Sequence, residues 1–153
     1  MGLIQCQTKW QPGGLGFSAQ ARHHEFYMDA GAQSEDKGPS PKEMLLASIC
    51  ACSGIDVASI LQKMRVDLQT CDVNAKTETT TNYPSIFTEV QLEYRITGAG
   101  ISSEQALKAV RLSMTKYCGV SAMVAESVPM TYQVFLNEKH IGADKADFRG
   151  SAE

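Results

Sequence analysis

The sequence predicts an α+β protein in which antiparallel sheets wrap around a long buried central helix. Two observations lead to this expectation. Residues 44–61 are apolar on every side of a helical wheel and carry one charge, Asp56, and a helix of that kind is normally buried on all sides. Segments of alternating polar and apolar residues precede and follow it, as β-strands do. A chain of 153 residues with 43% hydrophobic and 20% charged residues is typical of a globular domain with its own core.

The central helix is predicted over residues 40–63, with a clear start signal. Ser40 is the expected N-cap, Pro41 suits the first helical position, and Glu43 completes a capping box. Small and polar residues interrupt the apolar run: Ser48, Ser53, Gly54, Asp56 and Ser59. With charged residues close on both sides, the run is short and polar for a bilayer, so no membrane span is expected.

The strands are predicted at residues 3–10, 16–22, 25–29, 68–80, 86–97 and 130–136. The clearest of them is 86–97, where apolar and polar residues alternate strictly. A second helix is expected to begin at Ser102, with Gln105 as its capping partner. Residues 1–136 are therefore expected to form the domain, and the polar segment 137–153 a mobile C-terminal tail.

Charge and cysteine content exclude several classes of function. The net charge is −3 and no basic run occurs, so neither nucleic acid nor an anionic membrane is an expected partner. The first ten residues lack the basic and apolar regions of a secretory signal. Five cysteines, an odd number, are unlike a disulfide framework and favour a reducing cytoplasm.

Three of the cysteines have ordinary explanations. Cys6 and Cys71 fall within predicted strands, where a free cysteine usually packs as a small apolar residue. Cys50 and Cys52 form a C-x-C pattern, but on a helix their side chains project about 200° apart and cannot face one partner together. Because the histidines are also scattered, no metal site is expected.

Cys52 and Cys118 are the candidates for chemistry. Cys118 ends the second helix just before Gly119, so its sulfur is expected to face the N-terminus of the short helix that follows, a position that favours a thiolate. Cys52 has unusually polar neighbours for a core helix. From the residues alone, two buried structural thiols explain the pattern equally well.

Two motifs favour chemistry at Cys52 and Cys118 over two structural thiols. The stretch SPKEMLLASICACSGIDVASILQKMR (residues 40–65) and the stretch KYCGVSAMVAESV (residues 116–128) resemble the OsmC/Ohr family of thiol-dependent hydroperoxide reductases, and within it the YhfA-like branch. The 66 positions between Cys52 and Cys118 are typical of that family. The resemblance covers residues 1 to about 136.

The resemblance implies an intertwined homodimer with an OsmC-like fold and its active sites at the subunit interface. It also implies reduction of organic hydroperoxides by a two-cysteine cycle, with Cys52 peroxidatic and Cys118 resolving. An external dithiol would reduce the resulting disulfide, and no metal or organic cofactor would take part. The implied role is defence against oxidative stress.

The family places a glutamate and an arginine beside the reactive cysteine, and the glutamate position differs here. A glutamate usually follows the proline at the helix start, but here that position is Lys42, and Glu43 lies one place along. The family also supplies an arginine from the N-terminal hairpin, where Arg22 is the one arginine of the region. Asp56 follows Cys52 by one helical turn, where a carboxylate would disfavour a thiolate. Glu43, Arg22 and Asp56 are thus candidate supporting residues, and a non-peroxidase redox-sensing or small-ligand-binding protein of the same fold is the alternative function.

Overall fold

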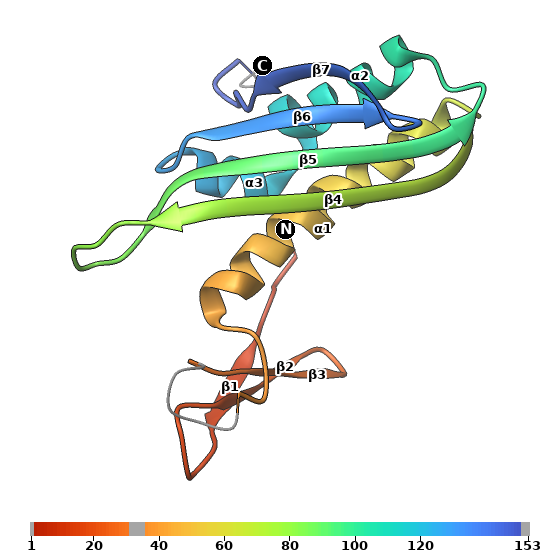
Figure 1. Cartoon of the computed structure of the whole chain (residues 1–153). Coiled ribbons are helices and arrows are strands. Elements are labelled where there is room, and N and C mark those ends of the chain that lie inside the picture. The colour runs from red at the N-terminus through yellow and green to blue at the C-terminus, as the bar shows by residue number, and fades with distance from the viewer. Residues whose placement is uncertain (1, 31–35, 151–153) are drawn as a thin grey trace. The chain divides into compact units, whose positions relative to one another are not determined.

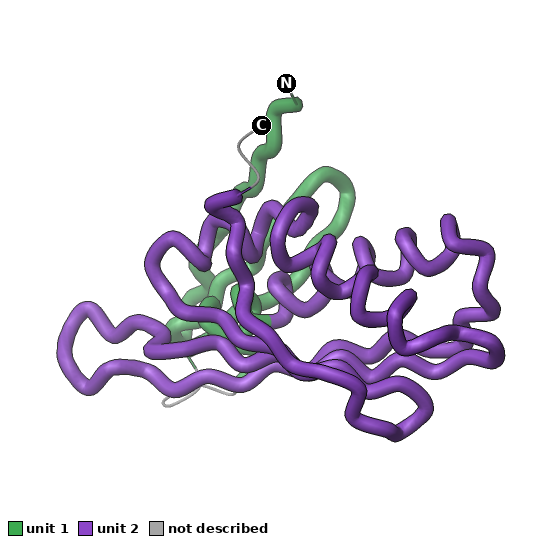
Figure 2. The backbone as a smooth tube through the Cα atoms, turned by 90° about the horizontal axis from the view of Figure 1, so that it is seen from above, with its two compact units in different colours: residues 1–46 green, residues 47–153 purple. Residues whose placement is uncertain are grey.

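The computed structural model describes residues 2–30 and 36–150 (Figure 1). The backbone divides into two compact units, residues 1–46 and residues 47–153, coloured separately in Figure 2. The α+β class predicted from the sequence is confirmed. Part of the segment expected to be without regular structure, residues 31–35, lies outside the described residues.

The first unit contains a three-stranded antiparallel sheet in the order β1-β2-β3. Its strands are β1 (Gln7–Trp10), β2 (Phe17–Ala21) and β3 (His24–Met28). The prediction of a strand over residues 3–10 is confirmed for residues 7–10 alone. Cys6 lies outside the strand and is exposed, so the predicted packing role of this cysteine is wrong for the single chain.

Helix α1 (Pro41–Lys63) begins as the sequence predicts. The backbone N–H of Ser40 donates to the Glu43 carboxylate at 2.7 Å, and the N–H of Glu43 donates to the Ser40 hydroxyl at 3.3 Å. These two bonds satisfy donors that would otherwise have no partner at the helix start. The hydrogen bond from the Ser40 backbone, followed by that from its side chain, lowers the pKa of Glu43.

One prediction about α1 is wrong for a single chain. The helix buries one stripe, Ile49, Ser53, Val57 and Leu61, whose spacing of four residues places the side chains on one face. Ile55, on another face, is 70% exposed. The helix is buried on one side because one sheet covers it. Alone among the described helices, α1 has the length and apolar composition of a membrane span, which core helices also have.

The second unit is built on a four-stranded sheet in the order β4-β5-β6-β7. Strands β4 (Asp67–Thr79) and β5 (Phe87–Ala99) form the long antiparallel hairpin seen in Figure 1. The pairing of β5 with β6 (Met130–Leu136) is parallel, which corrects the expectation of purely antiparallel sheets. A parallel neighbour requires a crossover connection, and helices supply it here. Figure 2 shows the helices of this unit gathered on one face of the sheet.

Three consecutive helical segments form the crossover. Helix α2 (Ser103–Leu112) has the predicted capping box between Ser102 and Gln105. It continues directly into a π-helical turn, η1 (Ser113–Tyr117), and α3 (Gly119–Ala125) follows. The core lies between these helices and the sheet, where β5 contributes the buried face that its alternation predicts: Val90, Leu92, Tyr94 and Ile96.

The segment expected to be a mobile tail contains a strand. Residues 139–145 form β7 (Lys139–Lys145), which pairs antiparallel with β6. The connection is a tight turn in which Asn137 and Glu138 both have positive φ angles, 48° and 65°, and asparagine tolerates that region well. The Asn137 side chain also accepts a hydrogen bond from the Gly98 N–H at 3.1 Å and donates to the Gly98 carbonyl at 3.2 Å. The fold thus continues beyond residue 136.

Gly98 is a position where we predict a large loss of stability on substitution. A Cβ added there would lie 2.1 Å from the Asp67 carbonyl oxygen and 2.6 Å from Ile101 Cδ1, so backbone would have to move. We expect Gly98→Ala to lower the free energy of unfolding by about 2–4 kcal/mol in urea denaturation. Gly119→Ala, where nothing lies within 4 Å of the added Cβ, is the control, and an equal loss in both variants would contradict the prediction.

Candidate functional site

The two cysteines singled out by the sequence lie near each other in the second unit. Cys52 is half-buried on α1, next to the buried stripe. Cys118 is fully buried between η1 and α3. Cys52 raises the pKa of Cys118, so the two thiols lie near each other although 66 positions separate them in the sequence. Both sulfurs are reduced.

Cys118 is held at the start of α3. It is the N-cap residue of that helix, and its sulfur accepts a hydrogen bond from the Ser121 N–H at 3.4 Å. The Ser121 hydroxyl oxygen lies 3.0 Å from the same sulfur. The predicted position of the sulfur at the N-terminus of a short helix is therefore confirmed. Ser121 was missed from the sequence, although its place three residues after the N-cap is where capping partners occur.

The expectation that this position favours a thiolate at Cys118 is wrong. Burial raises the pKa of Cys118 to about 11 from its ordinary value of 9.0, and the hydrogen bonds from Ser121 oppose this without reversing it. The hydrogen bond and the charge interaction with Cys52 raise the pKa of Cys118 further. A second group that can become negatively charged nearby makes the charged form of a thiol less stable. Cys118 is therefore a neutral thiol at physiological pH.

This raised pKa gives a prediction about stability at alkaline pH. Below pH 9.0, the Cys118 thiol is protonated in both the folded and the unfolded chain. As the pH rises toward about 11, only the unfolded chain loses the proton, so the free energy of unfolding falls. The shift corresponds to about 2–3 kcal/mol. We expect urea denaturation of the reduced protein between pH 8 and 11 to show this loss, and Cys118→Ala to show a decline smaller by about that amount. Parallel declines would contradict the prediction.

The π-helical turn before Cys118 is fixed to α1 by a buried serine. The Cys118 N–H donates to the Ser113 carbonyl at 3.0 Å, the i to i−5 bond of a π-helix. The Ser113 hydroxyl donates to Asp56 Oδ2 at 3.1 Å and lies 3.4 Å from the Ser53 carbonyl oxygen. Asp56 therefore has a structural partner in Ser113. Ser113 was not foreseen, since a π-turn has no reliable sequence signal.

Glu43 and Arg22, the other two candidate supporting residues, both belong to the first unit. Glu43 acts in the capping box at the exposed helix start. Arg22 is exposed in the turn between β2 and β3, with a φ of 57°. It lines a hollow of about 750 Å³ within the first unit, together with Cys6 and residues 3–5, 7 and 20. A role for either residue in the chemistry of Cys52 stays a prediction.

Cys50 and Cys71 are both half-buried. Burial raises the pKa of each thiol, that of Cys71 to about 11 with a further contribution from the charge of Asp72. Neither thiol is among the groups that shift the pKa of Cys118. Among residues 2–30 and 36–150, no group of three or more His, Cys, Asp and Glu side chains is arranged to hold a metal ion.

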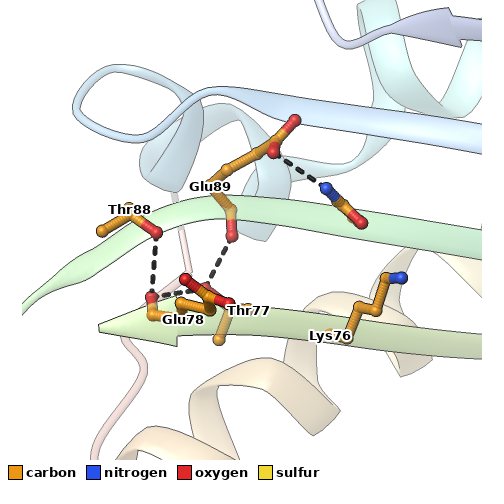
Figure 3. A pocket seen from close by; sticks show the side chains of 6 residues that line it. Lys76, Thr77, Glu78, Thr88 and Glu89 are labelled. Atoms are coloured by element: carbon orange, nitrogen blue, oxygen red, sulfur yellow. Dashed lines mark hydrogen bonds between the residues drawn. The ribbon is translucent and has the colours of Figure 1, made fainter. Parts of the chain in front are cut away.

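A hollow on the second unit has a different character. Its volume is about 520 Å³, and it is lined by residues of the β4–β5 hairpin: Lys76, Thr77, Glu78, Thr88, Glu89 and Gln91 (Figure 3). The Glu89 carboxylate accepts hydrogen bonds from Gln91 at 2.9 Å and from Thr131 at 3.1 Å, and the Thr77 hydroxyl donates to the Glu89 carbonyl at 2.6 Å. These polar groups are satisfied by one another, and none of the lining residues is a cysteine.

Comparison with known proteins identifies the family. Residues 34–133 match the family described as OsmC-like protein. The protein YhfA of Escherichia coli K12 is 38% identical over 129 residues, which cover 84% of this chain and 95% of that protein. The chain belongs to the OsmC family. The expected family and its YhfA-like branch are thereby confirmed.

Solved structures of OsmC-like proteins share the fold. An OsmC-like protein from Mycoplasma pneumoniae superposes with a TM-score of 0.78 at 14% identity, covering 88% of this chain and 97% of that one. An organic hydroperoxide resistance protein from Elizabethkingia anophelis gives a TM-score of 0.68 at 18% identity, covering 90% and 98%. These likenesses confirm the OsmC-like fold predicted from the two cysteine motifs.

Proposed function

We propose that this OsmC-family protein reduces organic hydroperoxides with Cys52 as the peroxidatic and Cys118 as the resolving thiol. The observation that supports this most strongly is the proximity of the two thiols, which lets Cys52 raise the pKa of Cys118. Neighbouring thiols can move together to form a disulfide, whose sulfurs are about 2.05 Å apart. A structural neighbour named as an organic hydroperoxide resistance protein supports the same class of reaction.

In the first step Cys52 reacts as a thiolate. Its sulfur attacks one oxygen of the hydroperoxide, the O–O bond breaks, and the alkoxide leaves and takes a proton to become an alcohol. The sulfur is oxidised by two electrons to a sulfenic acid. Cys52 is suited to this step because it is the more accessible of the two thiols, and a peroxide must reach the sulfur directly.

In the second step Cys118 attacks the oxidised sulfur. The new S–S bond forms as the sulfenic oxygen leaves, and the proton of the Cys118 thiol completes a molecule of water. The raised pKa of Cys118 fits this role because a neutral, buried thiol does not compete with Cys52 for the peroxide. An external dithiol then returns both sulfurs to the reduced state by exchange.

The protein is further proposed to act as a cytoplasmic homodimer. In one chain α1 exposes an apolar side chain on the side away from its buried stripe, that of Ile55, which is 70% exposed. Burial of such surface drives association. A second copy is the occupant that the family resemblance implies for this helix.

A redox sensor or ligand-binding protein is the second candidate. It is favoured by Lys42, which stands where the family resemblance implies a glutamate, because a missing activating group would slow the reaction of Cys52. Such a protein would keep the thiol pair and would show no sustained turnover.

The test is catalytic turnover of cumene hydroperoxide with dithiothreitol as the reductant. The peroxidase predicts many equivalents of peroxide consumed per protein, with the rate proportional to protein concentration. Hydrogen peroxide as a second substrate tests the preference for organic peroxides. Consumption limited to one equivalent would favour the sensor, and none at all would favour the ligand-binding protein.

A further inference from the structure

Tyr94 places a hydroxyl group inside the core next to the thiol pair. It lies on the buried face of β5 and is 0% exposed. Its ring packs edge-to-face on Tyr132 of the neighbouring strand β6, with centroids 6.2 Å apart and an angle of 89° between the planes. This packing fixes the ring, so the direction in which the phenol oxygen points is set by the fold.

The Tyr94 hydroxyl is buried without a hydrogen bond. Its oxygen is the one buried side-chain polar atom of the described chain that has no well-formed partner. Ser53 is a neighbouring hydroxyl and lowers the pKa of Tyr94, but that hydroxyl donates to the Cys50 carbonyl at 3.2 Å. Leaving a buried hydroxyl unpaired costs about 1–3 kcal/mol. A group held in this way calls for a functional explanation or a bound water.

Three thiols lie near enough to Tyr94 for their charges to act on its hydroxyl. Burial is the main cause that raises the pKa of Tyr94, and the charges of the thiols at Cys118, Cys50 and Cys71 raise it further. These groups come from α1, from the adjacent strand β4 and from the junction of η1 and α3. Of the three, Cys118 is the one whose own pKa Cys52 raises. The Tyr94 hydroxyl is therefore a buried donor without a hydrogen bond in the neighbourhood of the proposed resolving thiol.

We propose that Tyr94 donates a hydrogen bond to the sulfur of Cys118 when that sulfur becomes a thiolate and attacks oxidised Cys52. This inference rests on the proposed function, in which Cys118 is the resolving thiol. In the reduced protein the Cys118 thiol donates to the Ser121 hydroxyl at 3.0 Å and its sulfur accepts from the Ser121 N–H at 3.4 Å, while the Tyr94 hydroxyl makes no hydrogen bond. Once the proton leaves, the sulfur becomes a stronger acceptor and Tyr94 completes its set of donors.

The step balances without a further reagent. The thiol proton of Cys118 passes to the departing oxygen of the Cys52 sulfenic acid, which leaves as water, and the sulfur electron pair forms the S–S bond. The Tyr94 proton stays on its own oxygen throughout, because burial keeps the pKa of Tyr94 well above its usual range. Tyr94 thus lowers the energy of a buried thiolate without taking up or releasing a proton.

The test measures the reactions of the two thiols separately with 5,5′-dithiobis(2-nitrobenzoic acid), and it uses no peroxide. Attack by Cys52 releases one equivalent of the coloured thiolate, and attack by Cys118 on the mixed disulfide releases a second. The full-length chain carries Cys6→Ser, Cys50→Ala and Cys71→Ala so that two thiols remain. Tyr94→Phe then removes only the phenol oxygen. Tyr132→Phe is the matched control, because Tyr132 is also buried but its pKa responds to Asp144 and Arg111 rather than to a thiol.

We expect Tyr94→Phe to slow the second release about ten-fold and to leave the first unchanged, since a donor to a charged group shifts a pKa by about one unit. The rise of the second rate with pH should move about one unit higher. Tyr132→Phe should change neither. The inference would be overturned if Tyr94→Phe and Tyr132→Phe gave the same rate for the second release. It would also be overturned if both variants were slowed equally and in proportion to a loss of thermal stability. A parent protein with no second release would contradict the proposed pairing of Cys52 with Cys118 itself.

Discussion

Replacing Cys52 with serine is expected to abolish the reaction with cumene hydroperoxide, with a loss of at least about 1,000-fold in the second-order rate. A serine hydroxyl is not ionised at neutral pH and does not form the sulfenic acid on which the cycle depends. Cys118 does not substitute for it, because the remaining thiol is 0% exposed and its pKa is raised to about 11. Stopped-flow measurement of peroxide consumption gives the rate.

Cys118→Ser should behave differently. The first equivalent of peroxide should still react, and the Cys52 sulfenic acid should persist long enough to be trapped by dimedone as a single adduct. Cys71→Ser is the matched control, because burial raises the pKa of that thiol to about 11 as well but it lies outside the pair. Full activity of Cys52→Ser, or a disulfide in Cys118→Ser that includes Cys52, would contradict the assignment of roles.

The second large effect is expected at the exposed face of α1. Ile55→Asp should convert a dimer into a monomer, because the substitution places a charge in the middle of an apolar contact. An unpaired charge buried in this way costs about 3 kcal/mol or more, so the dissociation constant should rise about 100-fold or more. Light scattering over a dilution series measures the change.

The control is Gln133→Asp, which adds the same charge at an exposed position of β6. It should leave the association unchanged, and both variants should retain the thermal stability of a folded chain. A wild-type protein that is monomeric at all concentrations, or an Ile55→Asp variant that still forms dimers, would contradict the proposed assembly.

Features with a local physical cause were predictable from the sequence. Both capping boxes, at Ser40 and at Ser102, are confirmed, because the interacting residues are three apart and need no tertiary contact. The buried face of β5 is confirmed because a strand with one packed and one wet side alternates strictly. The position of Cys118 at the start of α3 is also confirmed, since Gly119 marks the break between helices.

Features that depend on tertiary structure were not predictable. Strand β7 is charged and its polar and apolar residues alternate poorly. It forms because the turn at Asn137 and Glu138 brings it beside the edge of β6, with which it pairs. The anchor between Asp56 and Ser113 joins residues 57 positions apart. The raised pKa of Cys118 was missed because burial outweighs the hydrogen bonds at the helix start, and the depth of burial cannot be read from sequence spacing.

The most direct test treats the fully reduced protein with one equivalent of cumene hydroperoxide and then maps its disulfides by mass spectrometry without reduction. The proposed function predicts the prompt loss of two thiols and a single cross-linked peptide pair that contains Cys52 and Cys118. Unchanged thiols, or a disulfide that leaves either of these two cysteines free, would contradict it.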